Sequence, residues 1–316
     1  MAGLTGRREV YTERQRRSRP PAGSNKGLRL FLSVLKYVLL TAGAVVVLLP
    51  FLEMFVGALR SPAERVATPP VFWPEVPQWG VYRQVFAELP MLRWYANSLF
   101  LAATITLIQL LTSTMAGFAL AKYEFRGRNL IFRAVLGAQM FPFFLFLIPL
   151  FFIMRFFPLA GGNDIFGQGG DGLLGTYAAV ILPFMVTYYG IFLMRQFMVN
   201  IPDTLLDAAR IDGASEFRIF WSVVLPLLKP ALVTLGVFVF LYQWNEFIWT
   251  FTVTRTNPDL QPLTVGIFLM QSAYDTTSGQ SLRQAALAVS VVPLALVFLT
   301  LQRYYVRGLV MSGIKG

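Results

Sequence analysis

The chain has 316 residues, of which 56% are hydrophobic and 14% are charged, and its mean hydropathy is +0.59. Soluble domains carry about 25% charged residues, so this composition indicates an integral membrane protein. The absence of cysteine and histidine excludes disulfide bonds, thiolate chemistry and the commonest metal ligand and acid–base group. With no paired carboxylate cluster either, the sequence predicts no catalytic residue and no metal site.

The formal net charge of +11 is concentrated at the start of the chain. Residues 1–29 contain eight Lys and Arg residues together with prolines and glycines. This composition predicts a disordered basic arm that could rest on anionic lipid. We expect no nucleic-acid binding, because no aromatic platform or base-reading element accompanies the basic residues. We also expect no cleaved signal peptide, since no small-residue cleavage site follows the first apolar run.

Six apolar segments follow the arm, and about 20 residues of helix suffice to cross the ~30 Å hydrocarbon layer. The predicted fold class is therefore all-α: a six-transmembrane-helix integral membrane protein. Its transmembrane domain is predicted over residues 30–305, followed by a tail over residues 306–316. The six segments are about 31–59, 97–121, 134–154, 173–194, 231–254 and 284–302.

Lys and Arg residues are distributed unequally between the connecting loops. The arm, the 122–133 and 195–229 loops and the tail hold 19 of the 27, whereas the three opposite loops hold seven. Because loops rich in Lys and Arg stay in the cytoplasm, this distribution predicts that both termini and residues 200–230 are cytoplasmic.

The opposite loops differ in character. Residues 60–93 are rich in Pro and Trp and predict a short interfacial helix around Val81–Glu88. Residues 157–175 are rich in glycine but contain no GK[ST] phosphate-binding sequence, and their acidic residues lack the spacing of a calcium loop. We interpret this second loop as a flexible connector.

Residues 200–230, here the 200–230 loop, form the longest polar-rich interruption in the second half of the chain. Pro202 favours a helix start, and Arg210 lies one turn after Asp207, within reach of an ion pair. Gly213 then ends this first helix, because glycine adopts the left-handed exit conformation at little cost.

A second helix is predicted from Ser215, which is a good N-cap. Pro226 and Pro230 are predicted to end it. By pattern alone, an ordinary helix–turn–helix connector fits these residues as well as a docking element does. Five apolar residues follow the helical period of one face: Phe217, Phe220, Trp221, Val224 and Leu225.

The run DAARIDGASEFRIFWSVVLP resembles the EAA loop of binding-protein-dependent ABC importer permeases, whose pattern is E-A-A, three residues, G and a downstream hydrophobic-x-L-P. This chain carries Asp207 where the family usually carries Glu, so the charge is kept on a shorter side chain. The runs 211–214 and 312–316 are similar to the carbohydrate (maltose-type) branch, and the resemblance covers roughly residues 95–316. The matched residues are Asp207, Ala208, Ala209, Asp212, Gly213, Leu225 and Pro226.

The resemblance implies a permease subunit of an ATP-driven importer for a sugar or oligosaccharide, in the plasma (inner) membrane of a prokaryote. Such a subunit forms half of the translocation pore and is not an enzyme, because ATP and Mg bind in partner ATPase subunits. No Walker A sequence occurs in this chain. The implied partners are a second homologous permease, an ABC ATPase dimer, an external solute-binding protein and membrane lipids.

In this family the counterpart of the 200–230 loop docks in a cleft of the ATPase and passes on its closure as a rigid-body motion. The residues implied for this coupling are Asp207, Ala208, Ala209, Asp212, Gly213 and Pro226. The tail is implied to extend towards the ATPase dimer through Gly313, Lys315 and Gly316.

A candidate substrate path lies in the fifth segment, where four residues share a helix face at i, i+3, i+4 and i+7. An ionisable residue within a span is a functional hypothesis, and aromatic faces beside amide and carboxylate groups suit sugars. The competing interpretation is that the carboxylate lies near the outer end of its helix and meets interfacial water. The four residues are Tyr242, Asn245, Glu246 and Trp249.

Other assignments stay open. An ion-gradient-driven secondary transporter usually shows inverted repeats and several intramembrane charges, whereas this chain shows no detectable repeat and one such charge, Glu246. Within the ABC class, a polyol or glycerol-phosphate importer is an alternative, although an anionic substrate would need basic groups mid-span and none is present. In the second segment, four polar residues could line the pore, but interhelical hydrogen bonds are favoured for them: Thr104, Gln109, Thr112 and Ser113.

Overall fold

The computed structural model describes residues 26–273 and 277–313. Every regular element in these residues is a helix, which confirms the all-α prediction. The first group of helices is α2 (Lys26–Ala58), α3 (Pro62–Val66), α4 (Gly80–Glu88), α5 (Met91–Lys122), α6 (Arg128–Ala138), η1 (Phe143–Phe146) and α7 (Leu147–Arg155). The second group is α8 (Tyr177–Ile181), η2 (Leu182–Phe184), α9 (Tyr188–Val199), α10 (Asp203–Ile211), α11 (Glu216–Ile219), η3 (Phe220–Val224) and α12 (Leu225–Leu227). The last group is α13 (Lys229–Asn245), α14 (Ile248–Thr254), η4 (Pro258–Leu260), α15 (Leu263–Ala273) and α16 (Thr277–Gly313).

Three helices in the described residues, α2, α5 and α16, are long and apolar enough to cross a membrane by themselves. Three further candidates are bent pairs: α6 with η1–α7 at 95°, α8–η2 with α9 at 44°, and α11–α12 with α13 at 79°. The described chain thus offers up to six spans by length and composition. The interval 134–154, which reads as one segment in the sequence, is divided where Pro142 supplies no backbone N–H and disfavours helical backbone before it.

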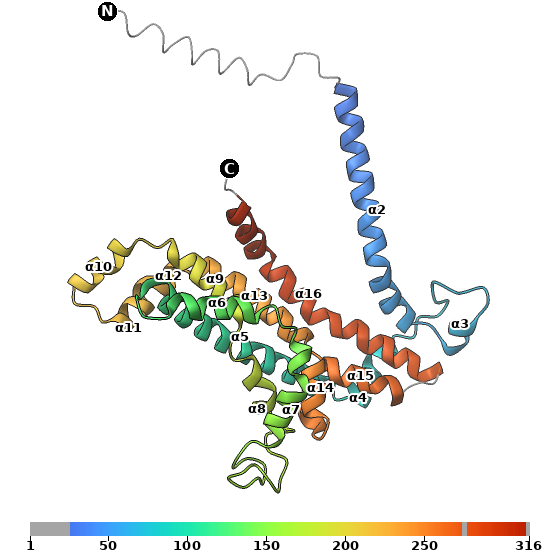
Figure 1. The fold of residues 1–316 in the computed structure, drawn as a ribbon. Coiled ribbons are helices and arrows are strands. Elements are labelled where there is room, and N and C mark those ends of the chain that lie inside the picture. The colour runs from blue at the N-terminus through green and yellow to red at the C-terminus, as the bar shows by residue number, and fades with distance from the viewer. Residues whose placement is uncertain (1–25, 274–276, 314–316) are drawn as a thin grey trace, which may run out of the picture.

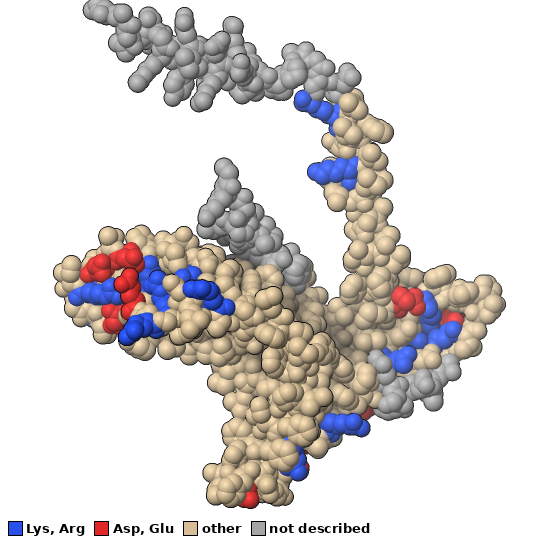
Figure 2. Space-filling view, viewed as in Figure 1, with Lys and Arg blue, Asp and Glu red and all other residues tan. Residues whose placement is uncertain are grey.

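Helix α5 is the centre of the bundle. It packs against α9 and α13, and it contributes buried side chains to all three apolar clusters of the core. The 200–230 loop lies at one end of these helices, and α14, α15 and the 157–175 loop lie away from it (Figure 1). Charged side chains gather over the 200–230 loop and around α3, and a broad uncharged surface separates them (Figure 2). This distribution suits a protein whose middle is surrounded by hydrocarbon.

Helix α2 stands apart from the bundle and meets the rest of the chain mainly through α16 (Figure 1). Residues 27–53 are exposed along the whole helix although most of them are apolar. A continuous apolar surface of this size is unfavourable in water. Helix α2 therefore requires lipid or another apolar protein surface around it.

Close packing of α5 on α9 depends on small residues. A Cβ atom on Gly117 would lie 2.8 Å from the Cβ atom of Met194, so only glycine permits this approach. Gln109 Nε2 donates to the Phe184 carbonyl at 2.6 Å, and Thr112 Oγ1 donates to a neighbouring carbonyl at 2.8 Å. The predicted interhelical hydrogen bonds are confirmed for these two side chains. For Ser113 the prediction is wrong, because its buried hydroxyl has no partner among the described residues, and no interhelical bond is described for Thr104.

The 157–175 loop differs from the flexible connector expected for it. Its backbone closes on itself through Asp164 N to the Gln168 carbonyl at 2.8 Å and Asp171 N to the Gly161 carbonyl at 2.9 Å. The buried Asn163 amide donates to the carbonyls of Arg155, at the end of α7, and of Phe157, at the start of the loop. The glycines permit tight chain crossings here rather than disorder. In the 60–93 loop, the short helix expected around Val81–Glu88 is confirmed as α4.

Candidate functional site: the 200–230 loop and the break after helix α13

The 200–230 loop contains two helices joined by a glycine turn. Gly213 has φ +78°, and the chain reverses there through bonds from Gly213 N to the Arg210 carbonyl and from Ala214 N to the Ala209 carbonyl, both 3.0 Å. Ser215 caps α11, its hydroxyl accepting a bond from a backbone N–H one turn later. The predicted helix end, turn and N-cap are all confirmed, because each depends on residues close together in the sequence.

The face of the second helix is different from the predicted one. Ile219, Phe220 and Val224 are buried, whereas Phe217 is 70% exposed and Trp221 is 43% exposed. From Phe220 onward the π-helical turn η3 departs from the α-helical period on which the prediction rested. Phe217 lies before this turn, in α11.

The two prolines also act differently from the prediction. Pro226 does not end the helix, because the widened turn before it makes room for the ring and α12 continues to Leu227. Pro230 lies in the first turn of α13, where a missing N–H is tolerated. The chain instead bends by 79° at Leu228, between α12 and α13.

An apolar core fixes the 200–230 loop to the bundle. Leu206 and Ile219 are fully buried, and the ring of Phe220 lies 5.6 Å from that of Phe118 on α5. Met198 of α9 completes the same cluster. Each such buried side chain contributes about 1.5–3 kcal/mol, so the loop is held as part of the bundle.

A chain of polar contacts links the loop to the end of α5. Arg210 pairs with Asp207 at 2.8 Å, as predicted, and also with Glu216 at 2.7 Å. The hydroxyl of Tyr123 donates to the other oxygen of Glu216 at 2.6 Å. Both helices of the loop are therefore tied to each other and to α5.

Lys122 makes a second link. Its side chain is 4% exposed and donates to the Asp203 carboxylate at 2.7 Å and to the Ile201 carbonyl at 2.5 Å. Lys122 and Tyr123 could not be predicted as partners of the loop, because they lie about 80 and 90 residues before the residues that they contact. No local pattern could have identified them.

The pKa shifts of this region predict how its attachment depends on pH. The Lys122 ammonium holds the pKa of the Asp203 carboxyl below its usual value, whereas burial, followed by the bond to Glu216, raises the pKa of Tyr123 to about 12. The Asp203 contribution is present above its unfolded pKa of about 4 and is lost as the pH falls. The Tyr123 contribution is present below about pH 10 and is lost as the pH rises towards 12.

We therefore expect the protection of residues 203–219 against hydrogen exchange, corrected for intrinsic rates, to stay constant between about pH 5.5 and 9. A loss of protection between about pH 5.5 and 9 would show that the Lys122–Asp203 and Tyr123–Glu216 contacts do not hold the loop.

Most of the residues implied for coupling lie together on the loop. Asp207, Ala208, Asp212 and Gly213 are exposed, and Ala209 is half-buried against the cluster beneath it. Pro226 is exposed on α12. Of the tail residues, Gly313 is the last of α16, whereas Lys315 and Gly316 lie outside the described residues.

The four residues of the candidate path do not share one helix face, because α13 ends at Asn245 and α14 begins at Ile248. Glu246 has extended backbone between them and accepts bonds from Trp249 N at 2.8 Å and Thr250 N at 3.0 Å. A carboxylate in an apolar segment requires such donors, and the start of a helix supplies them. The Glu246 carboxylate thus caps the start of α14 and does not lie on the predicted helix face.

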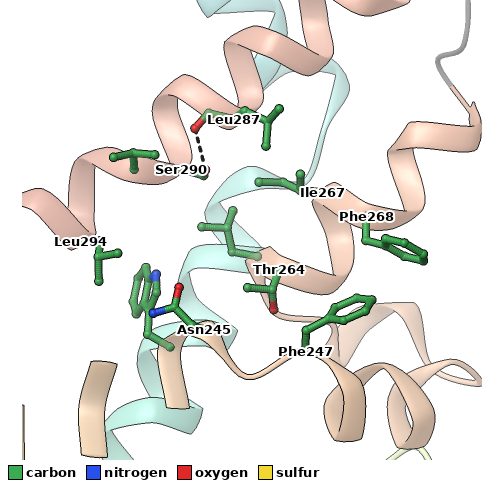
Figure 3. A pocket seen from close by; sticks show the side chains of 11 residues that line it. Asn245, Phe247, Thr264, Ile267, Phe268, Leu287, Ser290 and Leu294 are labelled. Atoms are coloured by element: carbon green, nitrogen blue, oxygen red, sulfur yellow. Dashed lines mark hydrogen bonds between the residues drawn. The ribbon is translucent and has the colours of Figure 1, made fainter. Parts of the chain in front are cut away.

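The other three residues of the candidate substrate path lie in different environments. Trp249 is completely buried, and its Nε1 donates to the Ala179 carbonyl at 3.0 Å. Tyr242 is 59% exposed on α13. Asn245 alone lines a pocket of about 370 Å³ beside the helix break (Figure 3). Walls of this pocket come from Phe247, Thr264, Phe268 and Ser290, among others.

Removal of the Glu246 cap gives a direct prediction. Glu246→Ala should cost about 1–2 kcal/mol of stability, because two N–H groups at the start of α14 lose their acceptor. Glu246→Gln keeps one acceptor oxygen and should cost less. Thermal unfolding of the purified protein in lipid nanodiscs measures both changes. An alanine variant as stable as the wild type would show that the cap is not stabilising.

Comparison with known proteins decides the family. Residues 109–310 match the family model of the "Binding-protein-dependent transport system inner membrane component". The chain belongs to this family. It is therefore a transport permease rather than an enzyme, and the resemblance seen in the EAA-like run is confirmed.

The alignments of this permease with its relatives cover almost the whole length of each relative. It is 33% identical over 285 residues to the arabinooligosaccharides transport system permease protein AraQ of Halalkalibacterium halodurans, covering 88% of this chain and 96% of the relative. It is 31% identical over 287 residues to the sn-glycerol-3-phosphate transport system permease protein UgpE of Pectobacterium atrosepticum, covering 89% and 97%. A bacterial ABC transporter involved in the import of the acidic polysaccharide alginate superposes with a TM-score of 0.75 at 25% identity, covering 90% of this permease and 100% of that chain.

Proposed function

We propose that this permease carries a sugar or oligosaccharide, forms half of the translocation pore and is driven by ATPase subunits that dock on the 200–230 loop. The observation that carries the proposal is the loop itself, a preformed turn whose exposed residues match the EAA pattern. Ile211 and Phe217 add exposed apolar side chains, 86% and 70% accessible, beside Asp207 and Asp212. An apolar patch rimmed by charge is typical of a protein interface.

Helix α5 is the route by which movement of the loop reaches the rest of the permease. Lys122 and Tyr123 join its last turn to the loop. Near its first turns, Asn97 donates to the carbonyls of Asp259 and Gln261 at 2.8 and 2.9 Å. One rigid helix therefore connects the loop with the segment between α14 and α15, and a push on the loop moves both ends together.

The proposed partners follow from the family and from the surfaces of the chain. An ABC ATPase dimer holding ATP and Mg would take the 200–230 loop, and an external solute-binding protein would take the opposite end. A second homologous permease and membrane lipids would cover the apolar surface of α2. The Lys and Arg distribution supports a cytoplasmic position for both termini and for the loop.

Affinity purification of the tagged permease from its native membrane in mild detergent, followed by mass spectrometry, tests the assembly. The expected result is an ATPase with a P-loop, a second permease and, after mild cross-linking, a solute-binding protein. A chain that is reproducibly free of ATPase would overturn the coupling proposal and favour an ion-gradient-driven transporter.

A polyol or glycerol-phosphate substrate is the second candidate, and the similarity to UgpE favours it. The pocket at the helix break favours a neutral sugar over glycerol phosphate, because none of its lining side chains is charged. Calorimetry of the co-purified binding protein with arabinotriose and with sn-glycerol 3-phosphate separates the two substrates.

A further inference from the structure

The pocket at the helix break has the dimensions and walls of a small-molecule site. Its volume of about 370 Å³ falls in the range of ligand pockets. In Figure 3, Asn245 from the end of α13 lies across one space from Thr264 of α15 and Ser290 of α16. None of its lining residues is charged. The pocket exists because α13 stops at the break and leaves the space that a further turn of helix would fill.

One side chain of this wall, Trp244, carries an indole N–H without a partner among the described residues. Trp244 as a whole residue is only 7% exposed, but this N–H is not among the fully buried unpartnered atoms of the described residues, so it is accessible. Trp249, five residues later, shows the usual arrangement, since its N–H donates to a carbonyl at 3.0 Å. Buried indole N–H groups usually find an acceptor. The N–H of Trp244, unlike that of Trp249, therefore stays available to a ligand that carries a hydrogen-bond acceptor.

Two other polar side chains of the pocket, Asn245 and Ser290, offer hydrogen-bond acceptors. Asn245 Nδ2 donates to the Leu241 carbonyl at 2.7 Å, and Ser290 Oγ donates to the Leu287 carbonyl at 2.6 Å (Figure 3). The Ser290 hydroxyl hydrogen and one N–H of Asn245 are thus occupied, and the oxygen of each side chain keeps lone pairs for an external donor. The wall consequently presents donors from Trp244 and Asn245 and two acceptors among aromatic and aliphatic side chains.

We propose that this pocket binds a neutral polyhydroxylated ligand, in line with and dependent on the proposed function as a sugar permease. A sugar hydroxyl both accepts and donates, so it can accept from Trp244 and donate to Asn245 or Ser290. The CH faces of a sugar ring pack on aromatic side chains such as Phe247 and Phe268. A phosphate or carboxylate would be desolvated here without a cation, which excludes anionic ligands from this pocket. This permease therefore contacts its substrate itself.

The test uses the complete importer reconstituted in proteoliposomes with its binding protein and ATPase, and the probes are radiolabelled arabinotriose and sn-glycerol 3-phosphate. Trp244→Phe keeps the ring and deletes the donor, and Ser290→Ala deletes an acceptor with little change in volume. Each should raise the half-saturation concentration for arabinotriose about 5–10-fold, the usual effect of losing one hydrogen bond. Thr234→Val, on the same helix but outside the pocket, is the matched control and should leave the half-saturation concentration unchanged.

Both variants should assemble with the ATPase and the second permease as the wild type does, which co-purification measures. If the wild type takes up arabinotriose and both variants do so with unchanged half-saturation, the pocket is not the site, although the sugar assignment stands. If the wild type takes up only glycerol phosphate, the sugar assignment itself fails, and this inference fails with it. Ser290→Ala decides the outcome if the tryptophan variant does not assemble.

Discussion

Replacement of Gly213 by proline should reduce uptake by the reconstituted importer at least about tenfold, while the protein still inserts and its helices remain. Gly213 has φ +78°, a value that proline, with φ near −65°, cannot adopt. Proline would also remove the N–H that bonds to the Arg210 carbonyl at 3.0 Å. The turn would then open, and the exposed residues on either side of it would no longer face one partner surface.

The matched control is Gly213→Asn. No atom lies within 4 Å of a Cβ placed on Gly213, so a side chain fits there, and asparagine tolerates the left-handed conformation better than other residues. The asparagine variant should keep most of the uptake. The measurement is uptake together with ATPase activity stimulated by the binding protein. Normal coupling in the proline variant would show that the turn is not the docking element.

Trp249→Ala should destabilise the protein by about 3–5 kcal/mol, more than the loss of the Glu246 cap. The side chain is completely buried, its ring meets Phe143 edge to face at 6.3 Å, and its N–H bonds to the Ala179 carbonyl. Alanine would leave a cavity between α14 and α8. Such a loss corresponds to a fall of roughly 6–15 °C in the apparent melting temperature for a chain of this size.

Calorimetry in lipid nanodiscs measures this change, with Trp249→Phe as the graded control. Phenylalanine keeps most of the ring volume but deletes the bond to Ala179, so an intermediate loss of about 1–3 kcal/mol is expected. An alanine variant that melts with the wild type but transports poorly would return Trp249 to the substrate path predicted from the sequence.

The features of the 200–230 loop that could be predicted are those with local causes. Gly213 ends α10 because of its own conformational freedom, Ser215 caps the next turn, and Arg210 reaches Asp207 within one helical turn. The apolar face of the second helix could not be predicted, because η3 changes the helical period on which the prediction rested. The attachment to Lys122 and Tyr123 depends on the packing of distant segments and has no signal in the sequence.

The same division holds in the membrane domain. Runs of apolar residues predict membrane helices, since hydrocarbon demands an apolar surface and internal backbone hydrogen bonds. They do not show where a helix breaks. Residues 242–249 keep a helical pattern in the sequence, yet α13 ends at Asn245, where Glu246 turns to cap the start of α14. A continuous helix would leave the Glu246 carboxylate unpaired, whereas the break loses a few backbone hydrogen bonds. Which of the two costs less free energy depends on the side chains packed around residue 246.

By itself, the sequence determined that this is an all-α membrane protein, that it carries an EAA-like loop and that it lacks catalytic and metal-binding side chains of the usual kinds. Composition and short motifs suffice for these properties, because each follows from solvent preference or from residues a few positions apart. The tertiary structure alone decided which end of α5 holds the loop, where the fifth segment breaks and that Trp244 borders a pocket with a free donor. These properties depend on contacts between residues far apart in the chain, and such contacts exist only after the helices have packed.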